Sequence, residues 1–252
     1  MNSAESLPPP DAFQVGASAW HPLRPDLVEL LRRATHTAIR PIYYGSNHTF
    51  LVTVEAGDAG ESYAVYKPSR GEYPLYDFSP GSLYRREIGT YLVSELLGWE
   101  LVPATVETSG RYGVGSLQLF VEAYSSGEVA VAELRRVALL DLVVNNADRK
   151  GEHCLLGEGG KLWTIDHGLT FHQQPKLRTV LWHFSGDPIT AQDLEALQSL
   201  RDELRNPRRR ETRDLRRLIS TVEWRALVLR VERLVSSERF PDPRYKAVPY
   251  RW

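Results

Sequence analysis

Residues 144–156 of this chain read Val-Asn-Asn-Ala-Asp-Arg-Lys-Gly-Glu-His-Cys-Leu-Leu, and residues 162–168 read Leu-Trp-Thr-Ile-Asp-His-Gly. In each segment an aspartate follows an apolar run, so Asp148 and Asp166 are expected on two neighbouring loops. Phosphoryl transfer needs one carboxylate that orients the attacking hydroxyl and a second that holds a metal ion on the nucleotide phosphates. The spacing of the two aspartates is that of such a catalytic loop and metal-binding turn. The alternative is that both only form turns, because Asp and Gly are common turn residues.

Lys67 and Glu87 lie upstream in a pattern that favours the catalytic interpretation. Residues 62–68 form a β-rich run that ends near Lys67, where a kinase keeps the ammonium group that contacts the nucleotide phosphates. A solvated lysine at a sheet edge is the alternative. Apolar residues at spacings of three and four predict a helix over residues 85–97, which Gly98 terminates. Glu87, in the first turn of that helix, can either favour the helix dipole or pair with Lys67.

A small polar turn precedes these elements. Residues 41–54 predict two strands that are joined at Gly45, Ser46 and Asn47. Backbone N–H groups in such a turn can lie over phosphates. The segment holds one glycine, so a plain hairpin is the alternative. The turn is therefore a candidate for nucleotide binding.

Taken in order, these landmarks resemble those of the phosphatidylinositol 3- and 4-kinase superfamily. The resemblance is strongest to type II phosphatidylinositol 4-kinases and to short actinobacterial proteins related to them, and it runs from about residue 40 to about residue 190. Any one string is weak, but six occur in the family's order. They are Tyr66-Lys67-Pro68, Glu87 with Tyr91-Leu92 and Leu97-Gly98, residues 102–105, residues 115–124, Asn146-Ala147-Asp148-Arg149, and residues 165–171.

The resemblance implies a role for each matching residue. Lys67 would contact the nucleotide phosphates and pair with Glu87. Asp148 would be the catalytic aspartate, and Asp166 would bind the metal ion. The strand that links the lobes would contribute backbone groups to the adenine edge, and its residues are Gln118, Leu119, Phe120 and Val121. The implied cofactors are ATP and Mg²⁺ or Mn²⁺.

His153 departs from the pattern of the family. It lies five positions after Asp148, where relatives have an asparagine that supplies a second metal oxygen, and Lys150 replaces a histidine or glycine. A neutral imidazole is a good ligand for zinc or manganese and a poor one for magnesium. We therefore expect His153 to be a metal ligand that alters the metal preference, or else to turn away and fill space.

The same pattern predicts an α+β, two-lobed, protein-kinase-like fold. A small antiparallel β lobe would carry one main helix, and the large lobe would be mainly helical. The expected organisation is a loose N-terminal tail (1–17), a nucleotide-binding N-lobe (18–117), a connection (118–127) and a C-lobe with the catalytic loop and acceptor site (128–252). ATP should bind in the cleft between the lobes.

Helices should make up most of the C-lobe. The longest apolar run, residues 137–144, is interrupted by Asp141 and predicts a buried helix that leads into the catalytic loop. Further helices are expected around residues 191–204, 211–222 and 224–236. Residues 170–188 should lie over the acceptor site.

Composition excludes several classes of protein. A chain of 252 residues with 42% hydrophobic content can bury a sizeable core. Its net charge of -1 gives no electrostatic attraction to nucleic acid. No apolar run approaches the roughly 18 residues of a membrane span. The expected partners are a nucleotide and an unidentified acceptor, with no nucleic acid.

Cys154 is the single cysteine, so no disulfide can form within the chain. This count, with no signal-peptide pattern at the amino terminus, favours a cytoplasmic protein with an inert thiol. The chain also lacks the cysteine cluster that eukaryotic lipid kinases of this type use for palmitoylation. We therefore expect no stable membrane anchor. Four histidines within residues 153–183 could suggest zinc, but their spacing with Cys154 matches no recognised zinc motif.

Two functions remain open at this level. The first is an ATP-dependent phosphotransferase that acts on a hydroxyl of a small molecule, an inositol-type compound or a protein. The second is a nucleotide-binding pseudokinase, or an enzyme that transfers another part of ATP. The basic run 205–217 is either a solvated helix start or a dock for an anionic partner, and residues 240–252 either pack on the C-lobe or form a recognition tail. The sequence determines neither the acceptor nor the oligomeric state.

Overall fold

The computed structural model describes residues 20–43, 47–124, 128–243 and 246–249. The predicted tail at residues 1–17 lies outside them, as do Gly45 and Ser46 of the predicted phosphate-binding turn.

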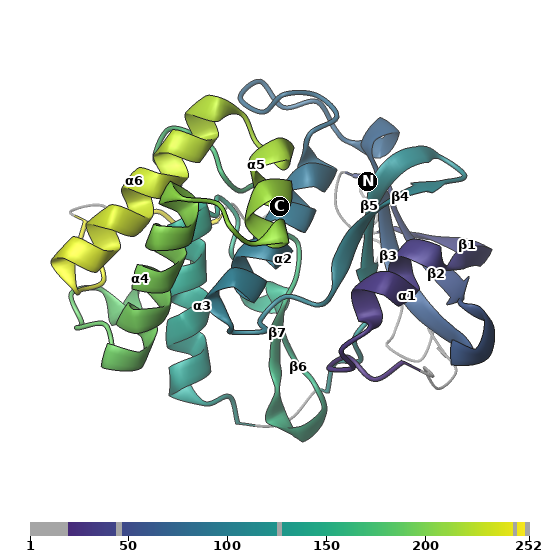
Figure 1. Ribbon diagram of the computed structural model, residues 1–252, viewed down its shortest axis with the longest axis horizontal. Coiled ribbons are helices and arrows are strands. Elements are labelled where there is room, and N and C mark those ends of the chain that lie inside the picture. The colour runs from purple at the N-terminus through teal and green to yellow at the C-terminus, as the bar shows by residue number, and fades with distance from the viewer. Residues whose placement is uncertain (1–19, 44–46, 125–127, 244–245, 250–252) are drawn as a thin grey trace, which may run out of the picture.

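Five strands form one antiparallel sheet in the order β1-β2-β3-β5-β4, on the right of Figure 1. They are β1 (Thr35–Ile42), β2 (Thr49–Glu55), β3 (Glu61–Pro68), β4 (Thr105–Gly110) and β5 (Gly113–Leu119). In β3, Ser62, Ala64 and Tyr66 are buried while the residues between them are half-buried. Because side chains alternate along a strand, Lys67 lies on the face opposite these residues.

Helix α1 (Leu27–Arg33) was not predicted. Its buried residues Leu27, Leu30 and Leu31 follow one another at spacings of three and four, which is the pattern of an amphipathic helix. The helix contacts β4.

Helix α2 (Leu83–Leu97) stands between the sheet and the helices of the second lobe (Figure 1). It contacts β4 and β5 on one side, and α3 (Val131–Val144), α4 (Ala191–Arg205) and α5 (Arg210–Leu218) on the other. Thirteen of its fifteen residues are buried, which explains why it is not amphipathic. Gly98 ends it in the left-handed conformation (φ 66°), as the sequence predicts.

The second lobe is mainly helical. Its helices are α3 (Val131–Val144), α4 (Ala191–Arg205), α5 and α6 (Thr221–Ser237), and one hairpin joins β6 (Cys154–Leu156) to β7 (Leu162–Thr164). Helix α5 ends at Leu218, four residues before the predicted end at 222, because Ser220 forms a capping box with Glu223 and starts α6. The predicted two-lobed α+β fold is confirmed.

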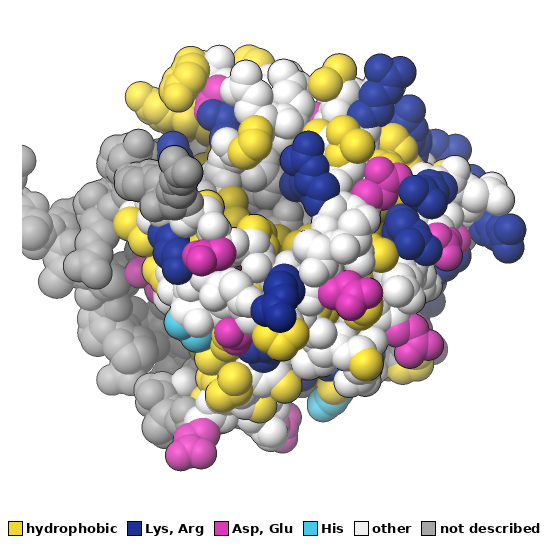
Figure 2. All heavy atoms as spheres, turned by 90° about the vertical axis from the view of Figure 1, so that its left-hand side faces the viewer, with side chains coloured by type: hydrophobic (Ala, Val, Ile, Leu, Met, Phe, Trp, Pro, Cys, Tyr) yellow, Lys and Arg dark blue, Asp and Glu magenta, His cyan; other side chains and the backbone are white. Residues whose placement is uncertain are grey.

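The basic run 205–217 lies at the end of α4 and in α5. Most of its arginines are exposed, and several pair with acids, as Arg205 does with Glu232 and Arg217 with Asp214. On the face of the molecule seen in Figure 2, basic and acidic side chains are likewise interspersed. Such exposed pairs contribute little to stability. Among the described residues, no helix has the length and apolar character that a bilayer crossing requires.

Candidate active site

Lys67 is the centre of the candidate site. Its Nζ lies 2.5 Å from Oε1 of Glu87 and 3.0 Å from Oδ1 of Asp166. These three residues come from β3, from α2 and from the loop after β7, so the contact joins both lobes. The predicted pairing of Lys67 with Glu87 is present, and Asp166 joins it.

The ammonium group of Lys67 and the carboxylate of Asp166 each stabilise the charged form of the other. Burial alone would lower the pKa of Lys67, but the carboxylates of Asp166 and Glu87 raise it above its usual range. The ammonium group of Lys67 in turn holds the pKa of Asp166 well below its usual range. Burial raises the pKa of Glu87 against the opposing charge of Lys67. Lys67 is therefore a fixed cation, and Asp166 a fixed anion.

The backbone holds Asp166 in an uncommon conformation. Its φ is 60°, in the left-handed region that only a few per cent of residues other than glycine adopt. The next residue, His167, donates its backbone N–H to Oε2 of Glu87 at 2.8 Å. Glu87 thus contacts Lys67 with one oxygen and the Asp166 loop with the other. Local strain held in this way is common at functional sites.

Asp148 lies on the loop that follows α3. Asn145 ends that helix with a φ of 55°, and the side chain of Asn146 accepts a hydrogen bond from the backbone N–H of Asp148 at 3.0 Å. Burial raises the pKa of Asp148 to about 6, although the charges of Lys150 and Arg178 oppose this shift. A carboxylate with a pKa close to neutral is suited to exchange a proton with a hydroxyl.

A buried network beneath Asp148 was not predicted. Asp141 and Arg149 are both fully buried and form an ion pair at 2.9 Å. Asn146 donates to Asp141 at 2.9 Å, and Arg149 lies 2.8 Å from the Nε2 atom of His167. This network links α3, the Asp148 loop and the Asp166 loop. Its signal in the sequence was Asp141 itself, an acid inside an apolar run, since a buried acid requires a partner.

His153 and Asp166 are the residues that could hold a metal ion. His153 is 3% exposed, and neither ring nitrogen has a hydrogen-bond partner among the described residues. Its Nε2 lies 3.4 Å from Oδ2 of Asp166, whose side chain is about half exposed. Burial lowers the pKa of His153, so its ring is neutral and able to coordinate a metal. No group of three such ligands forms among the described residues, so water or phosphate would complete the coordination.

The predicted adenine edge is only partly available. Gln118 and Leu119 belong to β5, beyond the expected lobe boundary at 117, and the side chain of Gln118 donates to Thr105. The backbone N–H groups of Leu119 and Phe120 already donate to Ala104 and Tyr63. Val121 follows as the first residue whose N–H makes no backbone hydrogen bond within the described part of the chain. Its N–H is therefore the donor that an adenine could meet.

Asn47 is the one residue of the predicted phosphate-binding turn that the structure describes. Its Oδ1 accepts a hydrogen bond from the backbone N–H of Tyr73 at 2.6 Å, and the N–H of His48 donates to the carbonyl of Gly71. The far end of the turn is thus attached to the loop after β3. Its contact with a nucleotide remains a prediction.

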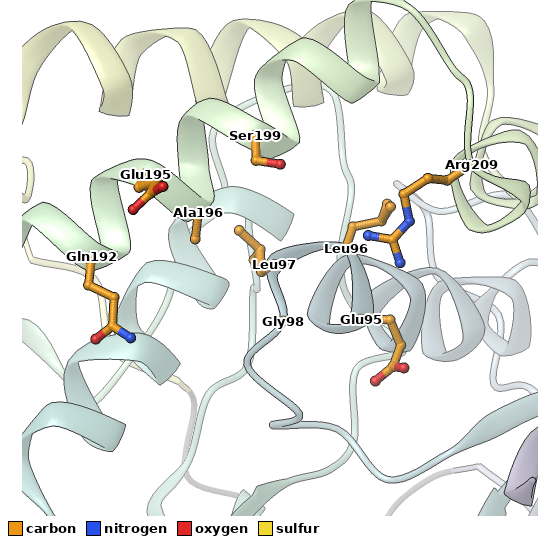
Figure 3. A pocket seen from close by; sticks show the side chains of 9 residues that line it. All are labelled: Glu95, Leu96, Leu97, Gly98, Gln192, Glu195, Ala196, Ser199 and Arg209. Carbon is orange, nitrogen blue, oxygen red and sulfur yellow. The ribbon is translucent and has the colours of Figure 1, made fainter. Parts of the chain in front are cut away.

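A hollow of about 300 Å³ opens at the C-terminal end of α2 (Figure 3). Glu95 and Leu97 of α2 line it together with Gln192 and Ser199 of α4, and Arg209 lies at one end. None of the candidate site residues lines this hollow. It is therefore separate from the cleft in which a nucleotide is expected.

The fold recurs in solved structures of low sequence identity. The Golgi casein kinase has a TM-score of 0.56 and 13% identity over 87% of this chain and 80% of that chain. A structure of that kinase with Mn/ADP bound has a TM-score of 0.55 and 14% identity over the same shares. A hydra Fam20 structure with sugar has a TM-score of 0.53 and 14% identity over 84% of this chain and 88% of that chain. These likenesses establish the kinase-like fold.

Sequence comparison identifies a relative. Over 270 residues the chain is 35% identical to Protein Rv2133c of Mycobacterium tuberculosis (strain ATCC 25618 / H37Rv), and the alignment spans 90% of this chain and 96% of that protein. The chain belongs to the Rv2133c family. No family model matches it. The likeness of this Rv2133c family member to phosphatidylinositol 3- and 4-kinases remains a prediction.

Proposed function

We propose that this protein is an ATP-dependent phosphotransferase that acts on a hydroxyl group. The observation that carries the proposal is the contact of Lys67 with both Glu87 and Asp166, residues that lie 20 and 99 positions away in the chain. A fixed ammonium group and a half-exposed carboxylate at the junction of two lobes suit a nucleotide with its metal ion.

Each residue has a role in the proposed reaction. Lys67, held by Glu87, binds the phosphates of ATP. Asp148 orients the acceptor hydroxyl and receives its proton as the hydroxyl oxygen bonds to the γ-phosphorus. The bond between that phosphorus and the oxygen bridging to the β-phosphate breaks, and ADP leaves with the electron pair. The N–H of Val121 is the proposed donor to the adenine edge.

Asp166 and His153 are the proposed ligands of a divalent ion. Their donor set, one carboxylate and one neutral imidazole, fits Mn²⁺ and tolerates Mg²⁺. When bound, such an ion neutralises charge on the β- and γ-phosphates. The Golgi casein kinase, which shares this fold, was solved with Mn/ADP bound.

Isotope transfer tests the proposal. The protein is incubated with γ-labelled or α-labelled ATP, against a cell lysate and a lipid extract in separate tubes. We expect only the γ-label to move onto an acceptor. Movement of the α-label would show transfer of a nucleotidyl group, and nucleotide binding without transfer of either label would support a pseudokinase.

Two variants assign the roles. Asp148→Asn should abolish γ-label transfer and leave ATP affinity nearly intact, because Asp148 acts on the acceptor and the transition state. Lys67→Met should weaken both transfer and ATP affinity. Asp202→Asn, on the surface of α4, is the matched control and should change neither. An equal loss of ATP affinity in Asp148→Asn would place Asp148 at the nucleotide and contradict its assignment.

A further inference from the structure

Residues 178–180 run alongside the catalytic loop as a short parallel pairing. The N–H of Arg149 donates to the carbonyl of Arg178 at 3.0 Å, and the N–H of Val180 donates to the carbonyl of Arg149 at 3.2 Å. The N–H of Arg178 donates to the carbonyl of Asn146 at 2.9 Å. Arg178 is therefore attached on both sides of Asp148, by residues 146 and 149.

This pairing determines which side chains share a face. Arg149 and Thr179 form the bridge, and both reach Asp141 in the buried network. Side chains alternate along paired segments, so the residues next to the bridge face the other way. Those residues are Asp148 and Lys150 on one segment and Arg178 and Val180 on the other. The catalytic aspartate thus shares its face with two cations.

The contacts of these cations agree with this placement. Nζ of Lys150 lies 3.4 Å from Oδ2 of Asp148, and both Lys150 and Arg178 are half-buried. Both lower the pKa of Asp148, against the larger effect of burial, so both act electrostatically on that carboxylate. Lys176, further back on the same segment, pairs with Asp77 at 2.6 Å.

Two cations beside a catalytic base require a reason, because each lowers the basicity of Asp148 and opposes its proposed role. Lys67, on the opposite lobe, is already the proposed cation that binds the phosphates of the nucleotide. Arg178 lies on the segment that pairs with the loop of Asp148, and its planar guanidinium matches phosphate and carboxylate groups. An anionic group on the acceptor would offset the charge of both cations.

We propose that the acceptor carries its own phosphate or carboxylate group, which Arg178 and Lys150 bind while Asp148 holds the hydroxyl to be phosphorylated. This inference rests on the proposed function. The anionic group can belong to a soluble phosphorylated or carboxylated polyol or to an anionic lipid headgroup. The chemistry of the site is the same in both cases.

Matched acceptors test the charge requirement. Transfer of γ-label is measured to glycerol and glycerol 3-phosphate, to myo-inositol and myo-inositol 1-phosphate, and to phosphatidylcholine vesicles with and without phosphatidylinositol. In at least one pair the anionic member should be phosphorylated at least about tenfold faster. The soluble and vesicle arms then identify the source of the anion. Equal rates within every pair that reacts would overturn the proposal.

Variants assign the preference to these residues. Arg178→Gln should reduce the ratio between anionic and neutral acceptors to near one, and Lys150→Gln should reduce it in part. Arg225→Gln, an exposed arginine on α6, is the matched control and should keep the ratio. An unchanged ratio in Arg178→Gln would overturn the assignment even if the preference itself exists.

A binding measurement separates this inference from the proposed function. Glycerol 3-phosphate and inositol 1-phosphate are titrated by calorimetry into wild type and both arginine variants, each saturated with ADP and Mn²⁺. Binding of either compound that Arg178→Gln weakens at least about tenfold and Arg225→Gln does not would support the anion site, even if no label moves in any assay. Equal binding by all three proteins would overturn it, and so would the absence of binding both to these compounds and to vesicles that contain phosphatidylinositol.

Discussion

Two opposing effects, burial and neighbouring positive charge, set the pKa of Asp148. Burial raises its pKa to about 6, and the charges of Lys150 and Arg178 hold it from rising further. If Asp148 must be ionised to receive a proton, kcat/KM should fall as the pH drops below about 6. Lys150→Met removes one of the positive charges that lower the pKa of Asp148. The fall of kcat/KM at acid pH should therefore begin at a higher pH in this variant. The dependence of kcat/KM on pH is measured for wild type, Lys150→Met and the control Lys161→Met. If kcat/KM falls at the same pH in Lys150→Met as in wild type, Lys150 does not act on Asp148.

Because its pKa is raised to about 6, the ionised side chain of Asp148 destabilises the fold at higher pH. Its folded pKa lies above the unfolded value of about 3.9, so the protonated carboxyl favours folding below pH 4 and this contribution is lost as the pH rises through 6. Asp148→Asn should therefore stabilise the fold at pH 8, by about 2 kcal/mol after allowance for the partial exposure of the carboxylate. The difference should shrink toward zero by pH 4. Denaturant unfolding at both pH values measures it, and a variant less stable than wild type at pH 8 would contradict the expectation.

His153 should determine which metal the site prefers. An imidazole favours manganese over magnesium more than an amide oxygen does. His153→Asn should thus shift the preference toward magnesium, as measured by ADP affinity with each metal. Because the ring must be neutral to coordinate, wild type should also lose metal-dependent affinity at acid pH. If the ranking of metals is the same in both proteins, His153 only fills space and Asp166 is the sole protein ligand.

At the scale of elements, α2 is attached firmly to the second lobe. Arg86 is buried, donates to the carbonyl of Thr170 and pairs with Glu223 at the start of α6, both at 2.5 Å. Gly89 lets Phe171 approach, since a Cβ there would lie 3.0 Å from its ring. Glu87, on the same turn as Arg86, is therefore held in register with Lys67 and the Asp166 loop.

Loss of Arg86 should loosen this attachment. Arg86→Met leaves Glu223 as a buried charge without its partner, and we expect destabilisation of about 3 kcal/mol or more. The double variant Arg86→Met with Glu223→Gln should recover part of the stability but still bind ATP more weakly than wild type. Arg85→Met, at the neighbouring position, is the control. If the double variant binds ATP as wild type does, the ion pair stabilises the fold without positioning Glu87.

At the scale of the molecule, the candidate nucleotide site lies between the two lobes. A ligand there should stabilise both lobes together, because a ligand that binds only the folded state adds about 2.7 kcal/mol at a hundred times its dissociation constant. ATP with Mg²⁺ or Mn²⁺ should raise the melting temperature, and Asp166→Ala should remove most of the metal-dependent part. Absence of binding by any adenine nucleotide with either metal, measured by calorimetry, would contradict the kinase assignment.

The sequence alone predicted most of the elements in their order, but it did not predict that Asp166 would contact Lys67. Strand alternation, helical spacing and the glycine after α2 are local signals, and local chemistry accounts for them. The pairing of Lys67 with Glu87 was left open by the residues themselves and was implied by the family resemblance. The end of α5 and helix α1 were missed, although the Ser220 capping box and the leucine spacing were present as signals.

Only the tertiary structure decided how the residues around the two aspartates are arranged. The buried network of Asp141, Arg149 and His167 joins positions 8 and 18 residues apart, on a helix and two loops, and no spacing rule connects them. The pairing of residues 178–180 with the catalytic loop, which places Arg178 beside Asp148, is likewise a contact between segments that the sequence does not relate. Local sequence determines helices and strands because their hydrogen bonds and alternation involve near neighbours. The charge around a catalytic group depends on which distant segments pack against it, and that is settled when the whole chain folds.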